Sequence, residues 1–219
     1  MNNKGMTLVE LLITFSLLMV IIVGMFNLIM DAKLDLDDQQ IAKDVIEYSN
    51  FLNNDIHYDL LKKKPFAIAL RENNLVPWKC IYNNDYISSE NCAIGDSAWN
   101  INTSITIEGE DVAVTGSTNA DICKSFYPCA IYAYYNSEAE NKVSFKAISV
   151  NFDDTTNYVQ GVRFGNAYEV IPDQKYIDTS RTGVEMRLDS QFFIIDFPIY
   201  IIGSDNNYGF KIAYPINEQ

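Results

Sequence analysis

The chain is poor in histidine and in basic residues. Its 219 residues include one histidine, His57, and 16 lysines and arginines against 29 aspartates and glutamates, so the formal net charge is −13. One histidine argues against metal sites built from several imidazoles and leaves a single candidate for a histidine-dependent triad, and His57 has the sequence context of a surface or packing residue. Because phosphate neutralisation needs clustered Lys and Arg, the charge also argues against direct nucleic-acid binding.

Charged side chains are missing from residues 11–30, and proline is missing from residues 6–64. Twenty helical residues span roughly 30 Å, the hydrocarbon thickness of a bilayer, so we predict a transmembrane helix. Lys4 precedes the apolar run, and four aspartates closely follow it. The positive-inside rule therefore predicts a cytoplasmic N-terminus and an extracytoplasmic C-terminal part.

The sequence differs from a removable secretory signal in the position of its candidate cleavage site. No small-residue cleavage site follows Met30, whereas a glycine, Gly5, precedes the apolar run. Glu10 lies near the start of that run. Because an acid at the centre of a membrane helix costs about 2.5–3.5 kcal/mol on insertion scales, an acid in an apolar helix is a functional hypothesis by default.

These features stand together in the sequence KGMTLVELL at residues 4–12. The string resembles the class III prepilin signal of type IV pilins and pseudopilins. The resemblance implies that a prepilin peptidase cleaves after Gly5 and methylates the new N-terminus at Met6, and that Glu10 acts in assembly. It departs from the usual pattern at Met6, where phenylalanine is common, and at Asn27, where major pilins often have proline. It further implies contacts with other pilin subunits, an inner-membrane assembly platform and membrane lipid.

The chemistry of the motif is consistent with these implied roles. Cleavage would place a free amine on Met6, four residues before Glu10, where it can pair with that carboxylate on the same helix face. It can equally pair with Glu10 of a neighbouring subunit, and the buried ion pair would then align the helices of the two subunits. The alternative is an uncleaved signal anchor with an incidental glutamate.

The helix is expected to continue well beyond the membrane segment. Apolar residues recur at helical spacing, and Lys62 to Lys64 followed by Pro65 favour a helix end. The prediction is one helix of about 57 residues, roughly 85 Å long. We expect a leader at residues 1–5, a transmembrane half-helix at 6–30, an amphipathic half-helix at 31–64 and a globular head at 65–219. The predicted apolar stripe is Leu34, Ile41, Val45, Tyr48, Leu52 and Ile56.

The head has the pattern of a β protein. Alternating or β-rich runs are separated by Gly, Asn and Asp, with the clearest loop at residues 203–209 and irregular stretches at 83–99 and 116–128. The predicted fold class is α+β, in which the long helix packs on an antiparallel, pilin-like head. The predicted strands are residues 100–107, 111–115, 130–135, 143–152, 158–164, 184–188, 192–202 and 208–214.

Four cysteines lie in the predicted head, and they allow three pairings. We favour the local disulfides Cys80–Cys92 and Cys123–Cys129, each worth about 2–3 kcal/mol by loop entropy. Free thiols and a four-cysteine zinc site are the alternatives, and the spacings of 12 and 6 lack the C-x₂-C pairs of zinc ribbons.

No cofactor is expected, although calcium is a weaker possibility. The oxygen-rich clusters Asp153-Asp154 and Asp205-Asn206-Asn207 have the ligand type that calcium prefers, but turns collect Asp and Asn in any case.

The sequence predicts a structural subunit rather than an enzyme, since no nucleophile elbow is present. We expect a minor pilin or pseudopilin that initiates or caps a filament serving adhesion and motility, secretion or DNA uptake. The large head and the absence of the helix proline favour a minor subunit over a major one. The protein would wait in the membrane and then reach a filament or the cell surface. Two alternatives are a membrane-anchored adhesin or receptor head that never assembles, and an anchored enzyme.

Overall fold

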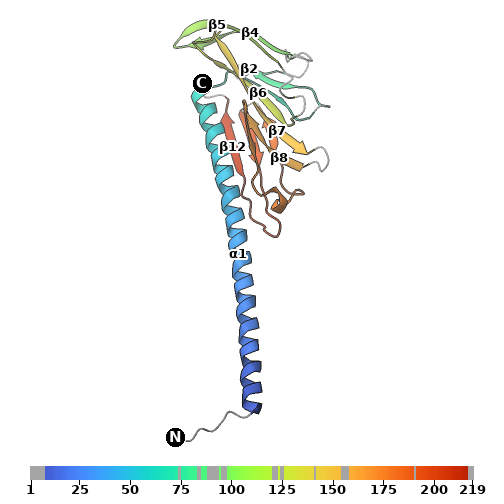
Figure 1. Cartoon of the computed structure of the whole chain (residues 1–219). Helices are drawn as coiled ribbons and strands as arrows, with labels where there is room; N and C mark the ends of the chain where they lie inside the picture. The colour runs from blue at the N-terminus through green and yellow to red at the C-terminus, as the bar shows by residue number, and fades with distance from the viewer. Residues whose placement is uncertain are drawn as a thin grey trace. The chain divides into compact units, whose positions relative to one another are not determined.

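The predicted α+β class is confirmed by the structure, a computed structural model that describes residues 8–73, 75–82, 85–87, 94, 98–119, 123, 126–140, 142–153, 158–189 and 191–216. A long N-terminal helix is followed by antiparallel strands (Figure 1). In chain order the elements are α1 (Leu8–Lys63), β1 (Ala67–Arg71), β2 (Lys79–Tyr82), β3 (Asp85–Ile87), β4 (Ala98–Ile107), β5 (Glu110–Asn119), β6 (Cys129–Tyr135), β7 (Val143–Asp153), β8 (Tyr158–Phe164), β9 (Ala167–Val170), η3 (Gln174–Tyr176), β10 (Glu185–Leu188), β11 (Phe192–Phe197) and β12 (Phe210–Pro215).

Two compact units divide the chain, and their boundary falls within α1: residues 1–43 form the first and residues 44–219 the second. In the first, the apolar side chains from Leu8 to Met30 are exposed along the helix. By length and composition, α1 is apolar enough over this stretch to cross a membrane. Its hydroxyls are satisfied internally: Thr14 Oγ1 donates to the carbonyl of Glu10 and Ser16 Oγ to that of Leu12, each at 2.9 Å. That arrangement suits a helix in lipid, where backbone and hydroxyl groups find no water.

The helix ends where the lysines and proline predict. The last helical residue is Lys63, and Lys64 adopts a left-handed conformation with φ of 44°. Its backbone N–H still donates to the carbonyl of Leu60 at 3.0 Å, which satisfies one of the unpaired carbonyls of the last turn. Pro65, which has no N–H, follows at once and turns the chain towards β1.

From residue 44 onward α1 belongs to the second unit, and one face of this part is buried there, as the apolar spacing predicts. The opposite face exposes Phe51, Tyr58 and Leu61, with 54%, 64% and 48% of their surfaces accessible. Ile41 of the predicted stripe is buried, and the side chain of Leu34 lies outside the described set. The buried apolar residues of the helix from position 44 onward are Val45, Tyr48, Leu52, Ile56 and Leu60, spaced by three or four residues.

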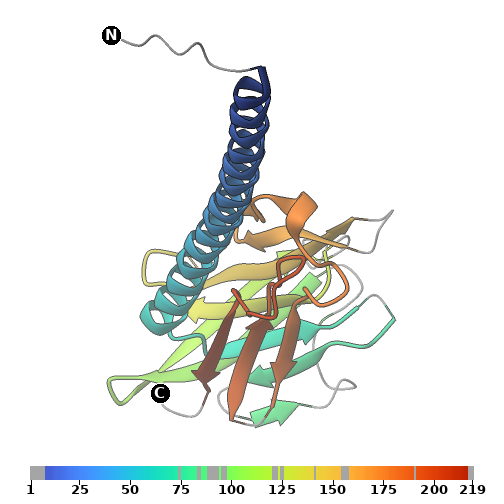
Figure 2. The ribbon, with the colours of Figure 1, turned by 90° about the horizontal axis from the view of Figure 1, so that it is seen from below.

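The centre of the head is a seven-stranded antiparallel sheet in the order β3-β2-β1-β6-β7-β8-β9. Successive side chains of a strand point to opposite faces, and both faces of the central strands are buried. Tyr132 of β6 lies on the face towards α1, where its hydroxyl bonds Asp59 of the helix. Residues in register with it, such as Ile68, share that face. The three-stranded sheet β10-β11-β12 lies beside the part of α1 that belongs to the second unit, and β10 contacts β1 and β2 (Figures 1 and 2).

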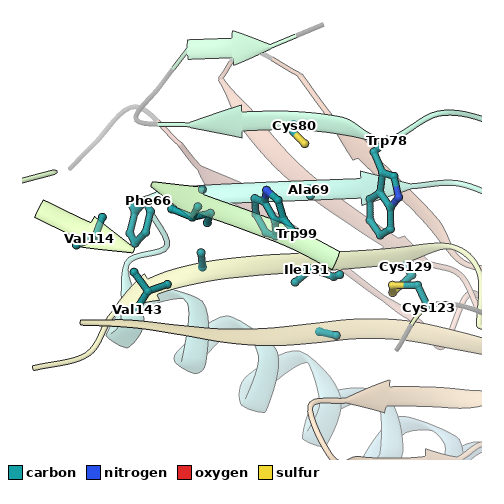
Figure 3. Packing of buried hydrophobic residues seen from close by; sticks show 14 of the residues in the cluster. Phe66, Ala69, Trp78, Cys80, Trp99, Val114, Cys123, Cys129, Ile131 and Val143 are labelled. Carbon is teal, nitrogen blue, oxygen red and sulfur yellow. A yellow bond between two sulfur atoms is a disulfide. The ribbon is translucent and has the colours of Figure 1, made fainter. Parts of the chain in front are cut away.

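The other face of the large sheet is covered by the two-stranded ribbon of β4 and β5. Trp99 of β4 is completely buried there, with Phe66, Val114 and Ile131 in the same apolar cluster (Figure 3). Its indole N–H donates to the hydroxyl of Tyr82, and the two rings meet edge-to-face with centroids 5.8 Å apart. A large aromatic side chain thereby fixes the ribbon to the sheet while its polar edge remains paired.

All eight predicted strand regions contain a strand, but the pattern missed β1, β2, β3 and β9. Strands β1 and β9 are short and lack the polar–apolar alternation, because β1 is buried on both faces and β9 is mainly exposed. The prediction of irregular structure at residues 83–99 and 116–128 was wrong in part, because β3 and the start of β4 lie in the first stretch and the end of β5 lies in the second. The run predicted at 192–202 ends at Phe197, because Pro198 has no N–H for the ladder.

Candidate functional site

The predicted processing site lies at the start of the chain, and Gly5 and Met6 fall outside the described residues. Glu10 lies in the first turn of α1 with its side chain exposed. A carboxylate at this end of a helix interacts favourably with the helix dipole. The first turn thus presents an exposed acid four residues after Met6, the predicted new N-terminus.

The junction between helix and sheet holds an ionic cluster that sequence reasoning missed. The Tyr132 hydroxyl donates to Asp59 Oδ2, while Asp59 Oδ1 lies 3.2 Å from both Lys63 Nζ and Lys146 Nζ. Lys146 Nζ also lies 3.4 Å from the centroid of the Phe164 ring. The only part of this cluster visible in the sequence is the i, i+4 pair of Asp59 and Lys63. The other partners come from β6 and β7, which are distant in the chain.

The cluster shifts two pKa values in opposite directions. Burial of the Asp59 carboxyl favours its neutral form, but the hydrogen bond from Tyr132 and the hydrogen bond and charges of Lys63 and Lys146 outweigh it and lower its pKa. Burial raises the pKa of the Tyr132 hydroxyl, and the hydrogen bond to Asp59 and the negative charge of that carboxylate raise it further. At neutral pH the carboxylate is therefore ionised and the phenol is protonated, which is the state that their hydrogen bond requires.

Asp59→Asn is expected to destabilise the head by about 1–3 kcal/mol, since it removes charge-assisted bonds from a mostly buried position. Because the folded pKa of Asp59 is lowered, its contribution is fully present above the unfolded value near 3.8 and is lost as the pH falls through the folded pKa. Urea midpoints at pH 7 and in steps down to pH 3 measure both effects. Asp55→Asn, an exposed acid on the same helix, is the control; an equal effect of both substitutions would remove the cluster as the cause.

One predicted disulfide is confirmed: Cys123, six residues before β6, is joined to Cys129, the first residue of that strand. Both residues are completely buried in the apolar cluster (Figure 3). Cys80 is also disulfide-bonded, and its predicted partner, Cys92, lies outside the described residues, so that pairing stays a prediction. The confirmed bond anchors the segment that enters β6 at the centre of the sheet.

Cys123→Ala/Cys129→Ala is expected to cost about 2 kcal/mol, because it restores the chain entropy that a short closed loop removes. A urea titration of the full-length variant in detergent, followed by tryptophan fluorescence, measures the shift. Its control is the unsubstituted protein under the same non-reducing conditions. An unchanged midpoint with an unchanged slope would mean that the bond does not stabilise the head.

The remaining candidate residues take ordinary structural positions. His57 is exposed on the outward face of α1 beside Tyr58 and Leu61. Asp205 pairs with Arg181 at 3.2 Å, and Asn207 Oδ1 accepts from the backbone N–H of Gly209 at 2.8 Å. Asp154 lies outside the described residues, as does the side chain of Asp153. Among described residues, no group of three or more His, Cys, Asp or Glu is placed to hold a metal.

A comparison with protein families adds the decisive evidence for the N-terminal segment. A family model described as the prokaryotic N-terminal methylation motif matches residues 1–26. No curated protein and no solved structure gives a significant match to the chain. Together with the long helix and the antiparallel strands, this match supports a type IV pilin-like protein. The motif is the class III signal of a pilin- or pseudopilin-type precursor, and it implies processing by a prepilin peptidase and assembly with other pilins.

Proposed function

We propose that this chain is a minor pilin or pseudopilin that initiates or caps a type IV pilus-like filament. The observation that carries the proposal is the methylation motif at residues 1–26, which continues into an uninterrupted helix of 56 residues bearing a large head. A structural role suits this arrangement, because the helix can hold the subunit in the membrane before assembly and can pack against other subunits afterwards.

Two features support a minor rather than a major role. The head contains three sheets in its described residues, and a bulky head is hard to repeat along a closely packed filament. Helix α1 also has Asn27 where major pilins often carry proline. Under this proposal the N-terminus is cytoplasmic, the head is extracytoplasmic, and the filament serves adhesion and motility, secretion or DNA uptake.

The exposed face of α1 in the head provides a surface for packing against another subunit. Phe51, Tyr58 and Leu61 line it at helical spacing, with Asp55 and His57 at its margin. Exposed aromatic residues next to charged ones are typical of protein contact surfaces. A membrane-anchored adhesin that never assembles is the alternative, and it requires neither Gly5 nor Glu10.

Mass spectrometry of the protein from its native membrane tests the processing step. We expect a mature chain that begins at methylated Met6, whereas Gly5→Val remains at its full length. Gly24→Val is the matched control, because a Cβ at Gly24 meets open space and the substitution lies away from the cleavage point. An intact Met1 in cells that contain the peptidase would falsify the proposal and favour the adhesin.

The abundance of the chain in purified filaments tests whether it is a minor subunit. Sheared filaments should contain the chain at a small fraction of the principal subunit, and deletion of the chain should lower the number of filaments rather than their thickness. An abundance equal to that of the principal subunit would contradict initiation or capping while leaving the pilin assignment intact.

A further inference from the structure

One polar side chain of the apolar run, that of Asn27, has hydrogen-bonding groups that α1 does not satisfy. Residues 11–30 contain two hydroxyls and one amide, on Thr14, Ser16 and Asn27. Each hydroxyl donates to a backbone carbonyl one turn earlier in the helix, at 2.9 Å. The amide of Asn27 is exposed and makes no hydrogen bond with any residue that the structure describes. Its donors and acceptor are therefore available to a group outside this chain.

The position of Asn27 makes an unpaired amide costly when α1 lies in a bilayer. Leu28, Ile29 and Met30 follow it and are apolar and exposed, so the amide lies about one helical turn inside the apolar run. An amide has two N–H donors and a carbonyl acceptor, and hydrocarbon contains no water to satisfy them. Amide side chains in this setting form hydrogen bonds with a neighbouring transmembrane helix.

Asn27 belongs to a row of residues with heptad spacing along α1. The members follow one another at intervals of four, three, four and three residues: Ile13, Leu17, Val20, Gly24 and Asn27. This spacing places them on one helix face, the face along which two helices of a left-handed pair meet. A Cβ at Gly24 would meet open space, so the backbone one turn before Asn27 is accessible for close approach.

A second copy of this chain supplies the complementary group at the same depth in the membrane. All copies insert in one orientation, because the same charges flank the apolar run in each. A parallel pair of identical helices places equivalent residues opposite one another, so the two Asn27 side chains face each other. Because an amide is both a donor and an acceptor, the two side chains satisfy each other without any further polar residue.

We propose that Asn27 pairs two copies of this chain through their membrane helices, in a parallel dimer that forms before any assembly into a filament. The two amides exchange N–H···O bonds, and Gly24 lets the helix backbones approach each other. The dimer requires that α1 lies in a membrane, but it does not require the chain to be a filament subunit.

Energy transfer between labelled copies in a bacterial membrane tests the proposal. The full-length chain is fused after Gln219 to a donor or an acceptor fluorescent protein that folds outside the cytoplasm. Transfer efficiency is measured over a range of expression levels, at equal amounts of each variant in the membrane fraction. We expect transfer above that of random encounters, and we expect Asn27→Leu to need about ten times the surface density for the same efficiency, since it loses the interhelical hydrogen bonds.

Two comparisons show whether the amides pair with each other. Thr14→Val is the matched control, because it removes a hydroxyl that the helix itself satisfies, at a position outside the heptad row, and it should leave transfer unchanged. A mixture of unsubstituted donor and Asn27→Leu acceptor should associate as weakly as Asn27→Leu alone, since one amide then has no counterpart. Equal transfer by Asn27→Leu and the unsubstituted chain, or strong transfer in the mixture, would overturn the amide pair. Transfer no higher than that of random encounters at every density would overturn the dimer.

Discussion

Glu10→Gln is expected to leave cleavage after Gly5 intact but to reduce incorporation into filaments by a hundredfold or more. Among apolar helices, the Met6 amine of a mature subunit needs a negative partner, and removal of one member of a buried ion pair costs about 3–5 kcal/mol. Because 1.4 kcal/mol corresponds to a factor of ten in an association constant, this loss is enough to prevent stable assembly.

The readout is the ratio of variant to unsubstituted protein in sheared filaments, each normalised to its amount in the membrane fraction. Glu47→Gln is the matched control, since it removes the same charge from an exposed position further along α1. Normal incorporation of Glu10→Gln would show that the carboxylate does not align subunits. Loss of cleavage would instead assign Glu10 to recognition by the peptidase.

Ile56→Asp is expected to unfold the head, with a loss of about 5 kcal/mol or more. Ile56 is completely inaccessible on the buried face of α1, so the change removes apolar burial and places an unpaired carboxylate inside the core. A loss of this size is comparable with the whole stability of many domains, which is about 5–15 kcal/mol.

Denaturant unfolding of the full-length protein in detergent, followed by tryptophan emission, measures this loss, because Trp99 reports on the ribbon and sheet. Phe51→Asp makes a similar change on the exposed face of the same helix, and its expected effect is within about 0.5 kcal/mol. If both variants had similar midpoints, the buried stripe would not be what holds the helix in the head.

The membrane-length apolar run, the glycine–acid signal and the helix end could all be predicted from the sequence. Each depends on residues close together in the chain: the absence of charge over residues 11–30, the spacing of Gly5 and Glu10, and the lysines before Pro65. The strands with clear alternation could be predicted for the same reason, because a half-buried strand shows its period locally.

Only the tertiary structure decided which strands are neighbours and which polar residues meet. The Asp59 cluster depends on β6 and β7 bringing Tyr132 and Lys146 to the end of α1, and residues 73 or more positions apart leave no local signal. The doubly buried β1 and the exposed β9 were missed because burial on both faces, or on neither, removes the alternation that identifies a strand.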